Sequence, residues 1–163
     1  MIVSKTSEYA LRALIYLVSQ GPGARLSADQ LANAIGAQPP FLAKIVQKLV
    51  KAGILDSKRG PSGGVSLAKA AGSVTLWQVI SALQGPTFLE GCILGLDTCD
   101  PNHPCPLHGD WLVIRRQLLS LLQSKTLQDL GQRVRINGAR VQYRRTRESS
   151  KSGSDGPKVP KTL

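Results

Sequence analysis

Apolar side chains recur at helical spacing through the first third of the chain. A stripe within residues 4–20 predicts an amphipathic helix, which the glycine and proline residues at 21–23 bring to an end. Ser27 and Gln30 form a capping-box pattern that predicts the start of a second, short helix, closed by Gly36. A third apolar stripe runs from Pro39 to Gly53, with its two prolines in the first turn, where a missing backbone donor costs little.

The pattern then changes from helical spacing to alternation. Apolar residues at 54–55 and at 65 and 67 flank the turn 58–64, which holds three glycines and predicts a β-hairpin. Thr75 and Gln78 repeat the capping box and predict a further helix. A helix, a short helix, a second long helix and a hairpin, in this order and with a turn of two or three residues before the third element, are typical of a winged helix-turn-helix domain.

The second half divides into a loop, a long helix and a tail. Residues 109–124 carry an apolar seam formed by Trp111, Ile114, Leu118 and Leu121 or Leu122, and Thr126 begins a last short helix. From about residue 143 the chain has few apolar residues and is expected to be disordered. We therefore predict a mainly α fold with a small β-hairpin wing, divided into a winged helix-turn-helix domain (1–84), a cysteine-rich loop (85–108), a long dimerisation helix with a short final helix (109–135) and a basic tail (136–163).

The distribution of charge along the chain indicates what kind of molecule the protein binds. The 163 residues carry a net charge of +11. The excess of positive charge is concentrated in two regions: residues 1–70 hold 9 Lys/Arg and 3 Asp/Glu, and residues 131–163 hold 9 Lys/Arg and 2 Asp/Glu. Residues 71–130 between them are acidic, with 3 Lys/Arg and 5 Asp/Glu. Two basic regions around an acidic one favour an anionic partner such as nucleic acid. No apolar run approaches a membrane span and no signal-peptide pattern is present, so a cytoplasmic protein is expected.

The helix-turn-helix reading places a DNA-binding surface on the third predicted helix and the wing. Its amino-terminal end would enter the major groove, where Gln38 has an amide suited to adenine. Lysines one and two turns further along this helix would contact backbone phosphates. An arginine at the tip of the wing could enter the minor groove, where the negative potential of DNA is concentrated. The candidate residues are Gln38, Pro40, Phe41, Lys44, Lys48, Arg59 and Ser62. The alternative is a solvated lysine stripe on an ordinary surface helix.

All three cysteines of the chain fall within fourteen residues of the predicted loop. Cys92, Cys99 and Cys105 are followed by His108, and these soft donors suit zinc, Cu(I) or an iron–sulfur cluster. Two alternatives use the thiols without metal: a disulfide sensor based on Cys92 and Cys99, and an enzyme with a Cys105–His108 nucleophile pair. No orienting group or substrate cleft is indicated for the second, so we do not expect an enzyme.

Three segments together resemble a known family. The wing sequence 59–64, the preceding residues 51–55 and the cysteine loop before a long helix resemble the iron–sulfur regulators typified by IscR and NsrR, over residues 1 to about 135. The resemblance implies that the three cysteines ligate a cluster. His108 stands where IscR-type members have a ligating histidine, which implies a 2Fe–2S cluster. Glu8 stands where NsrR-like members have a carboxylate that ligates a 4Fe–4S cluster of the other subunit, although it could simply pair with Arg12.

The resemblance also implies a homodimer formed by the helix 109–124, although the same seam could instead only bury the helix on its own domain. Two recognition helices would then read a palindromic operator in double-stranded DNA. His103 is expected to face solvent, although it could be a ligand if the loop folds back. The sequence thus favours a homodimeric DNA-binding transcriptional regulator whose DNA affinity depends on an iron–sulfur cluster. The alternatives are a zinc-stabilised and a metal-free, thiol-sensing winged-helix regulator.

Overall fold

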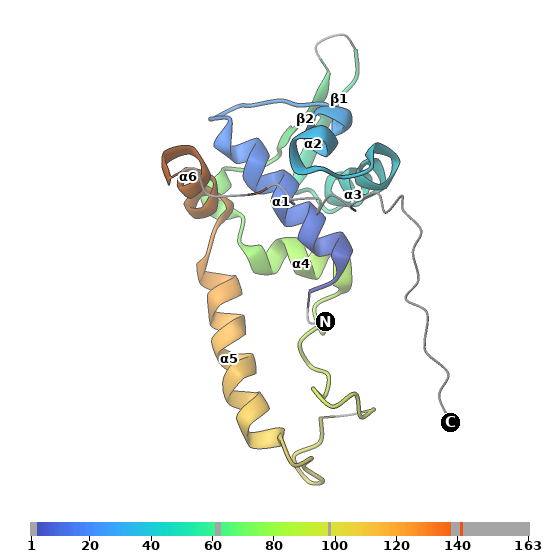
Figure 1. The fold of residues 1–163 in the computed structure, drawn as a ribbon, viewed down its shortest axis with the longest axis vertical. Coiled ribbons are helices and arrows are strands. Elements are labelled where there is room, and N and C mark those ends of the chain that lie inside the picture. Colours follow the sequence, from blue (N-terminus) through green and yellow to red (C-terminus); the bar gives the residue numbers. More distant parts are fainter. Residues whose placement is uncertain (1–2, 61–62, 98, 138–140, 142–163) are drawn as a thin grey trace, which may run out of the picture.

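A computed structural model describes residues 3–60, 63–97, 99–137 and 141 (Figure 1). The elements in these residues are the helices α1 (Lys5–Ser19), α2 (Ala28–Ile35) and α3 (Pro39–Lys51), the strands β1 (Leu55–Lys58) and β2 (Gly64–Leu67), the short 3-10 helix η1 (Ala71–Ser73), and the helices α4 (Leu76–Gln84), α5 (His108–Ser124) and α6 (Leu127–Asn137). The predicted mainly α fold with one hairpin is confirmed. The tail expected from residue 143 lies outside the described residues.

The helix-turn-helix forms for the local reasons that the sequence indicates. At the start of α2 the Ser27 hydroxyl accepts a bond from the Gln30 N–H, and the Gln30 side chain bonds back to the Ser27 N–H. Gly36 ends the helix in the left-handed conformation, at φ 69°. The apolar stripes of the first three helices meet in one core, whose fully buried members include Leu14, Leu17, Leu31, Ile35, Leu42, Ile45 and Leu49.

The wing is a two-stranded antiparallel hairpin with the register Leu55↔Leu67 to Lys58↔Gly64. A further bridge joins Val65 to Leu26, just before α2, through two backbone hydrogen bonds. This contact requires glycine at position 64, because a Cβ there would lie 2.7 Å from the Leu26 carbonyl oxygen. The wing is therefore fixed to the helix-turn-helix by hydrogen bonds of its own, in addition to the chain connections at its two ends.

The later helices build a second, smaller cluster and then return to the core. Ile80 of α4, Leu89 and Leu122 of α5 are buried together. From this cluster α5 projects away from the rest of the molecule, with its amino-terminal end farthest out (Figure 1). After α5, Leu127 enters the main core and α6 lies against α1. Within the described residues, no helix is both long and apolar enough to cross a bilayer.

Candidate metal centre and DNA-binding face

The cysteine loop runs from the end of α4 to the start of α5 and is held to α5 by one buried tryptophan. The indole Nε1 of Trp111 donates a 3.0 Å hydrogen bond to the carbonyl oxygen of Gly91, the residue before Cys92. Trp111 is only 6% exposed. The sequence pattern identifies Trp111 as an apolar seam residue but gives no sign of this bond, which fixes the first cysteine relative to the helix that begins with His108.

The four donors predicted from the sequence come together as two pairs. The Sγ atoms of Cys92 and Cys105 are 3.8 Å apart, and Cys99 Sγ lies 3.5 Å from Nδ1 of His108. All four side chains are half-buried, and the three cysteines are free thiols. The backbone N–H of His108 donates to the Cys105 carbonyl, so the last cysteine and the histidine are joined through the first turn before α5.

The Cys92 thiol lies in a small nest of backbone donors. The N–H of Leu94 above all, with those of Leu96 and Gly95 and the Cys105 thiol, lowers the pKa of the Cys92 thiol, against an opposing effect of desolvation. A lowered pKa raises the fraction of thiolate, which is the form that binds metal and attacks oxidants. This arrangement suits both a metal ligand and a redox-active thiol.

The remaining histidine of the loop is outside these pairs. The His103 side chain is 88% exposed, as expected, and its Nδ1 lies 2.9 Å from a carboxylate oxygen of Asp100. This contact and the Asn102 N–H lower the pKa of Asp100. Among the residues that the structure describes, no group of three or more His, Cys, Asp or Glu side chains surrounds a single point where a metal ion could bind.

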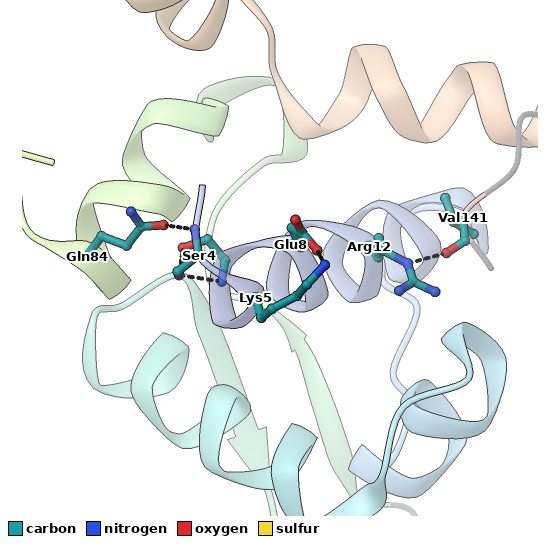
Figure 2. Close-up of polar contacts among 7 residues, drawn as sticks. Ser4, Lys5, Glu8, Arg12, Gln84 and Val141 are labelled. Atoms are coloured by element: carbon teal, nitrogen blue, oxygen red, sulfur yellow. Dashed lines mark hydrogen bonds and ion pairs between the residues drawn. The ribbon is translucent and has the colours of Figure 1, made fainter. Parts of the chain in front are cut away.

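Glu8, the alternative cluster ligand, has a partner other than the expected Arg12. Its carboxylate forms a 2.7 Å ion pair with Lys5 one turn earlier on α1 (Figure 2). Arg12 instead crosses to two distant carbonyl groups: its Nε donates to Val141 at 2.6 Å, and its Nη2 donates to Ile35 at the end of α2. Arg12 thereby joins Val141 to the carboxyl end of α2, beside the turn that precedes α3.

The predicted recognition residues on α3 lie on its exposed side. Gln38 caps the helix through its backbone alone, and its amide is exposed and makes no capping bond. Lys44 and Lys48 are also exposed, one and two turns along, while Leu42 and Ile45 face the core. Pro40 is exposed in the first turn. An exposed amide at the amino-terminal end, followed by a lysine row, is compatible with the major-groove binding predicted for this helix.

Phe41 also has a structural contact that the sequence did not reveal. Its ring packs edge to face with the ring of Tyr9 on α1, with centroids 5.4 Å apart and ring planes at 82°. It remains 39% exposed. Phe41 therefore fixes the amino-terminal end of α3 against α1 as well as presenting an apolar edge at the surface.

At the wing, Arg59 is exposed next to a tight glycine turn. The Gly63 N–H donates to the Gly60 carbonyl at 2.8 Å, and a Cβ at position 63 would lie 2.5 Å from the carbonyl oxygen of Lys58. The conformation of the turn is thus sufficient reason for glycine at position 63, independently of any approach of the wing to DNA. Ser62, the other predicted wing residue, lies outside the described residues.

The predicted seam on α5 separates into two faces. Trp111 and Leu122 are buried, and Leu118 packs beside Leu122 on the second cluster. Ile114 and Leu121, expected on the same seam, are 53% and 50% exposed. With Leu107 at 43%, these exposed residues follow one another at a spacing of seven. The helix therefore buries one face on its own chain and leaves an adjacent apolar face uncovered.

Comparison with known proteins gives a consistent result. Residues 3–133 match the model of the Rrf2 family, described as an iron-dependent transcriptional regulator. A protein of Aquifex aeolicus, provisionally named an HTH-type transcriptional regulator, is 33% identical over 132 residues, which cover 80% of this chain and 91% of that protein. Protein aau3 of Rhizobium meliloti is 31% identical over 80% of this chain and 84% of its own length.

Two solved structures share the fold. CymR, the global cysteine regulator of B. subtilis, has a TM-score of 0.67 and 26% identity, with 80% of this chain and 95% of CymR covered. IscR of T. potens has a TM-score of 0.63 and 24% identity, with coverage of 78% and 84%.

Proposed function

The chain belongs to the Rrf2 family of DNA-binding transcriptional regulators, and we propose that it is a homodimer whose affinity for DNA is set by a 2Fe–2S cluster bound to Cys92, Cys99, Cys105 and His108. In this proposal residues 1–84 bind DNA, 85–108 hold the cluster and 109–135 form the dimer and return to the core. The family and its relatives are regulators of transcription and not enzymes.

The spacing of the donor pairs is the observation that carries the proposal. A tetrahedral metal with bonds of about 2.3 Å to sulfur and 2.0–2.1 Å to nitrogen separates two sulfurs by about 3.8 Å, and a sulfur from a nitrogen by about 3.5 Å. The pairs Cys92–Cys105 and Cys99–His108 have separations of 3.8 and 3.5 Å. Each pair thus has the spacing of two ligands on one metal, and a 2Fe–2S cluster has two metals with two protein ligands each.

A single structural zinc would need all four ligands around one ion, and the contacts found here join the donors two by two. Glu8 belongs to neither pair and is bound by Lys5, which makes His108 the better candidate for the fourth ligand. When bound, the cluster supplies a centre that oxidants, nitric oxide or iron shortage can alter or remove.

One specific observation favours a second candidate, a metal-free thiol sensor. Cys92 and Cys105 are in contact, and the pKa of Cys92 is lowered. A disulfide needs a sulfur–sulfur distance of about 2.05 Å, so the loop would have to close further on oxidation. This candidate pairs Cys92 with Cys105, in place of the Cys92–Cys99 disulfide considered as an alternative in the sequence analysis.

The dimer is proposed from the uncovered face of α5. Leu107, Ile114 and Leu121 follow one another at a spacing of seven on this face, and a repeat of seven is the pattern by which two helices pack side by side. A twofold pair of α5 helices would place two α3 helices and two Arg59 side chains on a palindromic operator. Ligation of Cys99 and His108 would fix the loop at the first residue of α5. A coupling of about 1–3 kcal/mol between ligation and DNA binding would be enough for a switch.

The two histidines allow a matched test of the cluster. We expect wild-type protein purified without oxygen to carry about two iron and two sulfide ions per chain, with visible absorption bands. His108→Ala should lose most of this iron or shift the bands, whereas His103→Ala should behave as wild type because His103 is exposed. Cys99→Ala should be colourless and should change operator affinity in a fluorescence anisotropy titration.

Other outcomes would contradict the proposal in distinct ways. Four irons per chain, with retention in His108→Ala, would transfer the fourth ligand to a residue such as Glu8. Stoichiometric zinc would favour the constitutive structural site. Metal-free protein whose operator affinity changes with peroxide only when both Cys92 and Cys105 are present would establish the thiol sensor.

The dimer has its own test. Ile114→Glu places a charge on the uncovered face and should give a monomer in sedimentation velocity experiments. Ser120→Glu adds the same charge at an exposed position on another side of α5 and should leave the dimer intact. Equal sedimentation of the two variants would show that this face does not form the dimer.

A further inference from the structure

A cleft of about 590 Å³ lies between the carboxyl end of α1, the loop that follows it, strand β2, η1 and α6. Its volume is within the range of small-molecule binding sites, about 300–1,000 Å³. None of the residues proposed above for the cluster, for DNA reading or for the dimer lines it. The cleft is therefore a feature that the proposed function leaves unused.

The cleft has an apolar floor and a cationic rim. Leu17, Val18 and Leu67 contribute to the floor, and the lining contains no acidic residue. Its three cations come from separate segments: Arg25 from the loop before α2, Lys69 from the segment after β2, and Arg135 from α6. Such a combination complements a molecule that has an apolar body and an anionic group.

The three cations are held in different ways. Arg25 is fixed, since its Nη1 donates to the Gly64 carbonyl at 3.0 Å and its Nη2 lies 3.9 Å from the Asp56 carboxylate. In the part of the chain that the structure describes, no hydrogen bond or ion pair is found for the Lys69 and Arg135 side chains, and both are exposed. Two cations at one rim without a counter-charge leave this region electrostatically unbalanced.

Two glycines give the cleft its shape. A Cβ at Gly131 would lie 2.5 Å from Cγ1 of Val18, so only glycine lets α6 lie so close to α1 at this point. A Cβ at Gly72 would lie 2.7 Å from Oε1 of Gln128, so the Gln128 side chain, which lines the cleft, lies over the glycine of η1. One wall is therefore set by the close packing of α6 on the Val18 side chain, and another by the packing of Gln128 on η1.

We propose that this cleft is an effector site for a small organic anion: an aromatic or aliphatic body on the apolar floor, with one acidic group between Lys69 and Arg135. Such a ligand would contact β2 of the wing and α6 at the same time. It would thereby connect the DNA-binding wing to the helix that follows α5, in addition to any signal received at the cysteine loop.

The test uses two probes with the same ring system. 8-Anilinonaphthalene-1-sulfonate has an apolar body and one sulfonate, and N-phenyl-1-naphthylamine is the same molecule without the sulfonate. In a fluorescence titration of full-length wild-type protein, we expect the sulfonate to saturate at one molecule per chain and the neutral amine to bind at least tenfold more weakly. Lys69→Gln and Arg135→Gln should each weaken sulfonate binding about tenfold, equivalent to about 1.4 kcal/mol.

Arg133→Gln is the matched control, because it removes the same charge from the same helix at an exposed position outside the cleft. It should leave binding unchanged. Equal weakening by Arg133→Gln and Arg135→Gln would reduce the effect to general attraction between charges and would overturn the proposal. Binding of both probes with similar affinity, or sulfonate binding unaffected by either cleft variant, would also overturn it. Neither Lys69 nor Arg135 is among the side chains proposed above to read DNA, ligate the cluster or form the dimer, so such results would leave the proposed function standing.

Discussion

The hydrogen bond between Trp111 and Gly91 should decide how firmly the cysteine loop is held. Trp111→Phe keeps an aromatic ring at a site that is 6% exposed but removes the only donor of the side chain, and the Gly91 carbonyl then loses this partner. Gly91 is exposed, so water can replace the lost donor, and the expected cost is the net worth of one hydrogen bond, about 0.5–1.5 kcal/mol. Because the bond holds the loop and not the main core, we expect this cost to appear as local opening, with amide hydrogen exchange in residues 91–97 faster by about two- to tenfold.

Trp77→Phe is the matched control. Trp77 packs on Phe88 with ring centroids 5.1 Å apart, and no hydrogen bond of its indole is found within the described residues. This variant should lower overall stability to a similar degree through lost packing but leave exchange in the loop unchanged. The comparison is made by hydrogen-exchange mass spectrometry on metal-free protein, so it does not depend on the cluster. Equal loop exchange in the two variants would refute the idea that Trp111 fastens the loop through its bond to Gly91.

Three further predictions concern α6 and the tail. Gly131→Ala should lower the free energy of unfolding by about 1–3 kcal/mol through its collision with Val18, although alanine is the better helix former; a rise in the midpoint of thermal unfolding would contradict this. The N–H and hydroxyl of Thr126 lower the pKa of Asp129 below its ordinary value of 3.8, so this carboxylate stabilises α6 above about pH 4, and the stabilisation is lost as the pH falls further. Asp129→Asn should therefore be less stable than wild type at pH 7, and urea titrations should show this gap narrowing as the pH falls below about 4; a gap that does not change with pH would argue against this role. Residues 142–163 hold six Lys/Arg and two Asp/Glu, and Arg12 holds Val141, the residue before them, beside the turn that precedes α3. Deletion of 142–163 should therefore make the salt dependence of operator binding less steep, by about 1–3 in the slope of log affinity against log salt concentration. An unchanged slope would show that the tail does not touch DNA.

The parts of the fold that were predictable are those fixed by neighbours in sequence. The capping boxes at Ser27 and Thr75 need only residues three apart, and both are present as expected. The hairpin follows from alternation around a glycine turn. The wing's attachment to Leu26 was not predicted, because a backbone bridge across 39 residues has no signature in the pattern of side chains.

The candidate site was predictable in its members but not in its arrangement. Clustered soft donors identified Cys92, Cys99, Cys105 and His108, yet nothing in their order says that the first cysteine meets the third. The Trp111–Gly91 bond and the Arg12–Val141 bond were not predicted either, since both join segments that are adjacent only in the folded chain. The α5 seam shows the same limit: a spacing of three and four residues identifies apolar positions, but it does not say which of them a second chain would cover.

The crossed order of the donor pairs suggests why a signal in the loop would reach α5. Cys92, at the start of the loop, pairs with Cys105 near its end, while Cys99, in the middle, pairs with the helix residue His108. Ligation of both pairs would therefore close two overlapping loops, of thirteen and nine residues, and the ordering of the chain would be coupled to metal binding. Loss of the Cys99–His108 pair would free the middle of the loop from α5, while Trp111 still holds its start at Gly91. The exposed face with Ile114 and Leu121 begins less than two turns beyond His108, so a change at the ligands would act directly on the surface proposed to form the dimer.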